Sequence, residues 1–215
     1  MPVAPDTRLV EHVWTVVDVE TTGGQPGTGD RITEFAAVVV QGGCVVEQFC
    51  SLVHPERSIP PFIVHLTGIN DRMVADAPRF REIAPTVAAL VGRGTFVAHN
   101  APFDWSFVNA ELSRAGLPPD DEMRVCTVRL ARRLLQELPR RSLDHVCQHY
   151  GIAIEGRHRA LGDAAATASV LMRFLDELGR QGLDTWGDLD DYLARRTARR
   201  KRSAMPRAAD DTFAA

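Results

Sequence analysis

The stretch Trp14-Thr-Val-Val-Asp-Val-Glu-Thr-Thr-Gly23 joins an apolar, β-branched run to two carboxylates at alternate positions. Residues 13–19 offer no polar face, which predicts a buried strand. Side chains alternate across a strand, so Asp18 and Glu20 point to the same side. Burying two like charges side by side is costly unless a cation neutralises them, and a divalent metal suits oxygen ligands. The alternative is a strand end with both acids solvated before the Thr-Thr-Gly-Gly turn, and this pair alone does not decide between the two.

A second segment, Val97-Ala-His-Asn-Ala-Pro-Phe-Asp104, predicts a short strand over residues 95–98 followed by a helix. Asn100 is a good N-cap residue, and Pro102 is tolerated in a first helical turn. Asp104 then lies in that first turn, near the carboxyl end of the strand. Taken alone, it is explained by the helix dipole, which favours an acid at this place.

The third segment, His158-Arg-Ala-Leu-Gly-Asp-Ala164, comes directly before an amphipathic helix. Val170, Leu171 and Phe174 are among the apolar residues that recur there at helical spacing. Asp163 opens the helix, and His158 lies on the loop before it. Each residue alone has an ordinary explanation, as a surface histidine and as an acid matched to the helix dipole.

Together and in order, the three motifs resemble the DnaQ-like family of 3′-to-5′ exonucleases, and more narrowly its DEDDh branch. The five positions that define the branch are held here by Asp18, Glu20, Asp104, Asp163 and His158. His65-Leu-Thr-Gly-Ile69 resembles the family's loop along the substrate groove, and Arg31-Ile-Thr-Glu-Phe-Ala-Ala-Val38 resembles its second strand. The resemblance covers roughly residues 12–178 and extends to the proofreading epsilon subunit of bacterial DNA polymerase III.

The resemblance implies a role for each of the five residues. Asp18, Glu20 and Asp163 would hold a metal beside the attacking water, and Asp18 would bridge to a second metal supported by Asp104. Oxygen ligands suit Mg²⁺ or Mn²⁺, with two ions per active site. His158 would take the proton from the attacking water.

The same analogy implies the substrate contacts. They are expected from Thr21, Thr22, His65, Leu66, His99, Asn100 and Phe103. Phe103 is at a helical spacing that also suits packing in the core.

The order of the elements predicts an α/β fold with a mixed β-sheet flanked by helices, and the resemblance implies that it is ribonuclease H-like. Three strands come first, and Gly42-Gly43 predicts a hairpin between the second and third. Strands are expected at 13–19, 31–40, 44–53, 95–98 and 124–126. Helices are expected at 61–69, 79–91, 101–115, 127–135, 143–150 and 161–179. We expect an exonuclease domain over residues 1–182. Residues 183–215 would add a short helix and a basic, partly disordered tail, Arg195-Arg-Thr-Ala-Arg-Arg-Lys-Arg202, which is more simply solvated than bound to phosphates.

The chain has 215 residues, 45% of them hydrophobic, and a formal net charge of −3. This composition suits one domain with a short extension and gives no argument for or against nucleic acid. Cys44, Cys50, Cys126 and Cys147 have no metal-binding spacing, which favours free, mostly buried thiols in a reducing compartment. There is no signal-like start and no apolar stretch of membrane-spanning length, so a cytoplasmic protein without membrane contact is expected.

We therefore predict a metal-dependent exonuclease that releases nucleoside 5′-monophosphates from single-stranded or frayed DNA 3′ ends, in proofreading or repair. Such a function would imply a DNA polymerase or a repair protein as partner. A 3′-to-5′ exoribonuclease of the same fold is also compatible with the motifs, because no reader of the 2′-hydroxyl is identified. A second alternative is a catalytically silent nucleic-acid-binding protein, against which the presence of all five residues argues. A third is a phosphohydrolase for small nucleotides, which would need a closed pocket.

Overall fold

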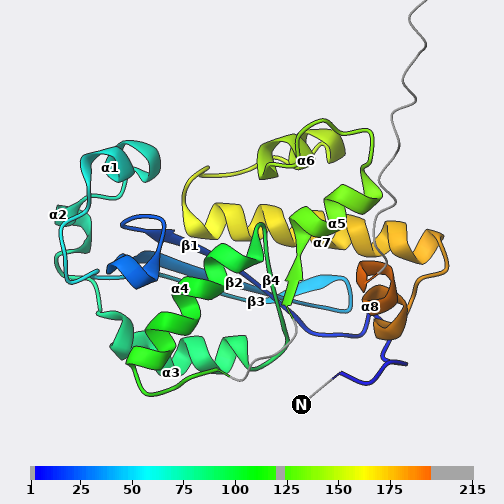
Figure 1. Cartoon of the computed structure of the whole chain (residues 1–215), viewed down its shortest axis with the longest axis horizontal. Helices are drawn as coiled ribbons and strands as arrows, with labels where there is room; N and C mark the ends of the chain where they lie inside the picture. The colour runs from blue at the N-terminus through cyan, green and yellow to red at the C-terminus, as the bar shows by residue number, and fades with distance from the viewer. Residues whose placement is uncertain (1–2, 120–123, 195–215) are drawn as a thin grey trace, which may run out of the picture.

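The computed structural model describes residues 3–119 and 124–194, and its strands form one mixed sheet in the order β3-β2-β1-β4-β5 (Figure 1). The strands are β1 (Trp14–Thr21), β2 (Ile32–Gln41), β3 (Cys44–Leu52), β4 (Thr95–Ala98) and β5 (Arg124–Cys126). The helices are α1 (Pro61–Thr67), α2 (Asp71–Val74), α3 (Phe80–Val91), α4 (Ala101–Arg114), α5 (Thr127–Leu134), α6 (Leu143–Tyr150), α7 (Ala160–Arg180) and α8 (Trp186–Ala194), with a short 3₁₀ helix η1 (Pro26–Thr28).

The central strand β1 is antiparallel to β2 and parallel to β4. β2 and β3 form the predicted antiparallel hairpin, and Gly42 and Gly43 both have positive φ angles at its turn. β4 and β5 are parallel. The predicted mixed sheet flanked by helices is therefore confirmed.

Helices cover both faces of the sheet, which is why β1 is apolar throughout its first half. One face packs Trp14 and Val16 of β1 in a core with α5, α6, α7 and α8. The other packs Val17 and Val19 in a core with α3 and α4. Figure 1 shows α7 crossing the sheet, with α3 and α4 on the opposite side. Strand alternation puts Asp18 and Glu20 on the face of α7.

The observed elements differ from the prediction at β1 and α2, whereas α8 is the short helix that was expected after residue 182. β1 extends beyond the predicted end at residue 19 to Thr21, so Glu20 as well as Asp18 lies within the strand. α2 was not predicted, because a four-residue helix shows no period; Asn70 Oδ1 caps it by accepting from Met73 N at 3.1 Å. α8 packs into the core, with the Trp186 ring 5.8 Å from that of Trp14.

The four cysteines are free, but only half of them are buried as expected. Cys126 and Cys147 are buried, whereas Cys44 and Cys50 are exposed because β3 is an edge strand with one open face. Within residues 3–119 and 124–194, no helix has the length and apolar character needed to cross a membrane. The basic run 195–202 lies outside the described residues.

Candidate active site

β1 delivers the first two acids to the end of the sheet where α7 begins. Asp18 pairs with Ala36 of β2, and Glu20 pairs with Glu34. Both side chains are half-buried. The turn that follows is tight: a Cβ atom on Gly23 would come within 2.4 Å of Asp30 Oδ2, so the Thr-Thr-Gly sequence needs its glycine.

The third acid reaches the same place from the first turn of α4. Asp104 is 3% exposed, and its Oδ1 accepts a hydrogen bond from Val19 N at 3.2 Å. The predicted capping role of Asn100 is not observed. Asn100 stands at the N-cap position with φ 79°, a left-handed conformation that asparagine tolerates, and its side chain makes no cap hydrogen bond.

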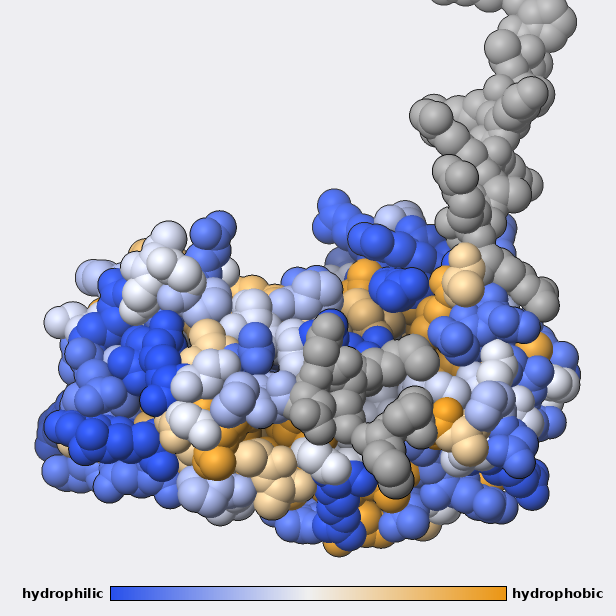
Figure 2. Space-filling view, turned by 60° about the horizontal axis from the view of Figure 1, so that its bottom comes forward, coloured by the Kyte–Doolittle hydropathy of each residue, from blue (hydrophilic) through white to orange (hydrophobic). Residues whose placement is uncertain are grey.

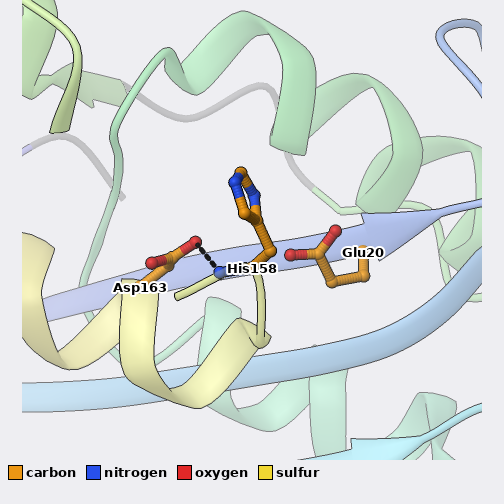
Figure 3. Close-up of side chains that lie close together, drawn as sticks. All are labelled: Glu20, His158 and Asp163. Atoms are coloured by element: carbon orange, nitrogen blue, oxygen red, sulfur yellow. Dashed lines mark hydrogen bonds between the residues drawn. The ribbon is translucent and has the colours of Figure 1, made fainter. Parts of the chain in front are cut away.

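The loop before α7 brings the fourth acid and the histidine. Asp163 is 4% exposed in the first turn of α7, and its Oδ2 accepts from His158 N at 3.2 Å. Gly162 permits this compact turn, since a Cβ there would overlap Glu155 O. His158 has φ 61°, in the left-handed region. Figure 3 shows its imidazole standing between the carboxylates of Glu20 and Asp163.

Glu20, His158 and Asp163 each offer one ligand atom, and the three atoms lie within 4.8 Å of one another. Asp163 Oδ1 is buried and has no hydrogen-bond partner in the part of the chain that the structure describes. A buried acceptor without a donor is costly, and a bound cation would satisfy it. The donor set of carboxylates and one imidazole therefore fits a divalent ion.

Burial and mutual repulsion of the acids raise their pKa values. Burial raises the pKa of Asp18 well above its usual value, and the charges of Asp104, Asp163 and Glu20 raise it further. Burial, followed by the charges of Asp163 and Glu34, raises the pKa of Glu20 to about 7.

The pKa values of the other two acids rise for the same first cause. Burial raises that of Asp104 well above normal, opposed by the hydrogen bonds it accepts from its own backbone N–H and that of Val19. Burial also raises that of Asp163, opposed by the charge of Arg157. The site is thus a set of carboxylates that ionise together only when positive charge is supplied.

Sequence reasoning did not identify three polar residues that hold the loop before α7. Glu34 is 2% exposed and accepts from Arg159 Nη2 at 2.6 Å and from Ala160 N at 2.8 Å. Arg157 contacts Asp163 and Asp144. The sequence did contain a signal for these residues: Glu34 is a charged residue within an apolar strand, and arginines stand on both sides of His158.

A hollow of about 360 Å³ adjoins Glu20, and some of the residues predicted to contact the substrate line it. Thr21, Leu66 and Phe103 line it, and so does Phe62, which was not predicted. Leu66 and Phe62 are 51% and 66% exposed, so apolar side chains stand open at the edge of the acidic site. Phe103 also packs on Phe107, with ring centroids 5.1 Å apart.

The other predicted substrate residues lie elsewhere or have partners in the protein. Thr22 is buried, and its Oγ1 accepts from Arg31 N at 3.0 Å. The ring nitrogens of His99 lie 2.9 Å from Thr127 Oγ1 and 2.9 Å from Arg141 O. His65 and Asn100 are exposed and do not line the hollow.

The described residues also form hollows away from the five predicted catalytic residues, and two of these hollows are apolar in part. One of about 840 Å³ lies beside the second half of α7, where Leu9, Met172 and Arg180 are among its lining residues. The other, of about 270 Å³, is apolar and includes Val91 and Trp105. Figure 2 shows orange apolar patches among polar side chains on the face that carries α3 and α4.

Comparison with known proteins points to one class of enzyme. Residues 15–171 match the sequence model of a family described as Exonuclease (RNase_T). A candidate bifunctional exonuclease/endonuclease protein of Mycobacterium tuberculosis, MT2247, is 41% identical over 88% of this chain and 30% of its own length. The 3′-5′ exonuclease DinG of Bacillus subtilis is 37% identical over 77% of this chain and 18% of its own length. The chain thus spans less than a third of these curated relatives.

Solved structures agree with the family match. Exonuclease X in complex with 5′ overhanging duplex DNA superposes with a TM-score of 0.67 and 29% identity, covering 84% of this chain and 99% of that one. Exonuclease I of E. coli in complex with a dT13 oligonucleotide has a TM-score of 0.69 at 22% identity, over 80% of this chain and 42% of that one, which is a likeness of fold. The expected ribonuclease H-like fold is confirmed.

Proposed function

This chain belongs to the exonuclease (RNase_T, DnaQ-like) family, and from that membership we propose that it is a metal-dependent 3′-to-5′ exonuclease acting on DNA. One observation carries the proposal. Four carboxylates and a histidine, from β1, α4, the loop before α7 and the start of α7, lie together at one end of the sheet.

The acids have the chemistry for two Mg²⁺ or Mn²⁺ ions. Asp18, Glu20 and Asp163 would hold one ion, and Asp18 and Asp104 would face the second. Two such ions, when bound, stabilise the attacking and the leaving oxygen of an in-line displacement at phosphorus. Asp104 stays in place because Val19 N holds its carboxylate, and Asp163 because His158 N holds its Oδ2.

His158 would act as the general base. It would remove a proton from water as the water oxygen attacks the phosphorus of the terminal nucleotide. The bond from phosphorus to the 3′-oxygen of the preceding nucleotide breaks, that oxygen takes a proton from solvent water, and His158 returns its proton to solvent. The product is a nucleoside 5′-monophosphate.

The hollow beside Glu20 would receive the terminal nucleoside. Phe62, Leu66 and Phe103 offer apolar and aromatic contacts to a base of any sequence. A single-stranded or frayed end enters such a hollow without the cost of unpairing. We assign this activity to residues 1–182, in a cytoplasmic protein that acts in proofreading or repair, where a DNA polymerase or a repair protein would supply the frayed ends.

The test is digestion of 3′-labelled and 5′-labelled oligonucleotides with Mg²⁺, with Mn²⁺ and with excess chelator. Single-stranded DNA should be shortened stepwise from the 3′ end, and blunt duplex DNA more slowly. Chelator should abolish the activity, and added metal should restore it. A faster rate on RNA of the same sequence would reassign the substrate, and activity in excess chelator would overturn the metal mechanism.

A matched control separates this enzyme from a contaminating nuclease. Asp163→Asn keeps the shape of the side chain and removes one negative charge from the proposed ligand set. Asp76→Asn makes the same chemical change at an exposed acid outside that set. Activity should survive the second change and be lost with the first.

A further inference from the structure

Arg157, the residue before His158, spreads its guanidinium between two helices. Its Nε and Nη2 donate to the two carboxylate oxygens of Asp144 in α6, at 2.7 and 3.2 Å. Its Nη1 donates to Asp163 Oδ2 in α7 and lies 3.4 Å from His158 Nδ1. One edge of the guanidinium is thus anchored, and the other faces the proposed catalytic groups.

The pair with Asp144 gives orientation rather than stability. The side chain of Asp144 is 55% exposed and that of Arg157 is 33% exposed, so water screens much of their attraction. A two-point contact nevertheless fixes the plane of a guanidinium, because both groups are flat and match in spacing. Asp144 therefore determines where Nη1 points.

The contact with Asp163 has a different character. The side chain of Asp163 is 5% exposed, and its Oδ2 already accepts from His158 N. A metal ion on this carboxylate would repel the guanidinium and weaken the attraction that holds Nη1. Nη1 would then be a donor in need of a new acceptor, while Asp144 still held the rest of the group.

We propose that Arg157 is a phosphate-binding residue of this site, positioned by Asp144, and that its Nη1 exchanges Asp163 for a substrate phosphoryl oxygen when metal binds. The inference rests on the proposed function and deepens it. The water that His158 activates must lie against the phosphorus under attack, so a donor beside His158 is within reach of that phosphoryl group. Guanidinium donors match phosphate oxygens better than an ammonium does.

The experiment measures two affinities by calorimetry, for Mn²⁺ alone and for thymidine 5′-monophosphate added to the Mn²⁺-saturated protein. Arg157→Gln should bind Mn²⁺ as tightly as the wild type or up to about tenfold more tightly, because a competing cation is gone. It should bind the nucleotide roughly 10- to 100-fold more weakly, the usual effect of losing a charged hydrogen bond. Arg157→Lys, which keeps the charge, should fall between the two.

Asp144 is tested as a positioning residue. Asp144→Asn should leave Mn²⁺ binding unchanged and weaken nucleotide binding by a smaller factor, and Asp144→Glu should restore part of it. Arg93→Gln is the matched control, since Arg93 forms an exposed ion pair with Glu47 that involves none of the catalytic residues. It should change neither affinity. Melting curves of all variants establish that each is folded.

Two outcomes would overturn the inference while the proposed function stands. Nucleotide affinity unchanged in Arg157→Gln would show that Nη1 does not meet phosphate. Loss of Mn²⁺ affinity in the same variant would show that Arg157 serves to hold Asp163 for the metal instead. Failure of the proposed function looks different, because the wild type and Arg93→Gln would then also bind no Mn²⁺.

Discussion

The two halves of β1 lie on one strand and face one helix, yet they differ in what they need from their surroundings. Trp14 and Val16 are almost completely buried, and Trp14 Nε1 donates to Leu9 O at 3.1 Å. Asp18 and Glu20 continue the same face of the strand and meet further carboxylates there. The first half is stabilised by contacts within the protein, whereas the second gathers carboxylates whose ionised form a cation would stabilise.

The difference teaches that one regular strand can serve stability and catalysis in separate segments. Trp14 is almost completely buried in an apolar core, so the stability of this half comes from apolar burial and not from the acids. The acids raise one another's pKa values, and this repulsion opposes folding when no metal is bound. Catalytic capacity and local stability should therefore trade against each other at one end of β1 and be independent at the other.

The largest effect is expected from Asp18→Asn. Turnover should fall by roughly 10³-fold or more, because the residue faces both proposed ions. In chelator the melting temperature should rise by a few degrees, since one of several crowded charges is gone. Digestion assays measure the loss of turnover and melting curves in chelator measure the gain in stability, with Asp76→Asn as control. If Asp18→Asn stayed active and its stability did not change, the proposed difference between the apolar and the acidic half of β1 would be wrong.

His158→Ala should show whether His158 acts as the general base or as a metal ligand. Turnover should fall by roughly 10²- to 10⁴-fold, the usual contribution of a positioned acid–base group. Mn²⁺ affinity should persist because the carboxylates remain. If His158 is the base, the rate of the wild type should rise with pH, and this rise should be weaker in the variant. Calorimetry and pH–rate profiles of both proteins measure these effects. Lost Mn²⁺ binding would identify the residue as a ligand, and an unchanged rate would remove it from the mechanism.

Leu189→Ala removes a side chain of α8 from the core that surrounds the apolar first half of β1. Leu189 is 1% exposed in the core that contains Trp14, so the change should cost about 2–5 kcal/mol of unfolding free energy. The melting temperature should fall by roughly 5–15 °C, with little change in turnover below the transition. Leu193→Ala, on the half-buried face of the same helix, should cost less. Loss of turnover in the folded variant would show that the two halves of β1 are coupled.

The smallest effect is the pH dependence of stability. Burial and neighbouring charges raise the pKa of Glu20 from 4.5 to about 7. A group with a raised folded-state pKa stabilises the fold below its unfolded pKa, and this contribution is lost as pH rises through the folded pKa. In chelator the melting temperature should therefore fall between about pH 4.5 and pH 7.

Mg²⁺ should reduce that fall, because the ion binds the deprotonated carboxylates. Glu20→Gln should flatten the curve measured in chelator. Parallel melting curves across this pH range, with chelator and with Mg²⁺, provide the measurement. Identical curves in the two conditions would mean that no metal binds these acids.

Most of the fold was predictable because its strands carry strong local signals. A run rich in β-branched residues identified β1, and a Gly-Gly pair identified the hairpin between β2 and β3. The exposure of Cys50 was not predictable, since a strand sequence does not say whether the strand lies at the edge of its sheet. α2 escaped notice because four residues are too few to show helical periodicity.

The site was predictable as a set of motifs but not as a geometry. Asp18, Glu20, Asp104, Asp163 and His158 were identified from spacing and family resemblance. The contact between Val19 N and Asp104, and the anchoring of Arg157 by Asp144, join residues far apart in sequence. No local pattern encodes such contacts.

By itself the sequence determined which residues are apolar, which carry charge and how they alternate, because these properties belong to each side chain and its neighbours. That was enough to predict most of the strands and helices, and the resemblance of three motifs to a known family pointed to the five candidate catalytic residues. Only the tertiary structure decided that Leu66 and Phe62 are exposed in the hollow that adjoins Glu20, and that His99 forms a hydrogen bond with Thr127. The physical reason is that burial, hydrogen bonding and the crowding of charges are properties of packed surfaces, which form only when distant segments meet.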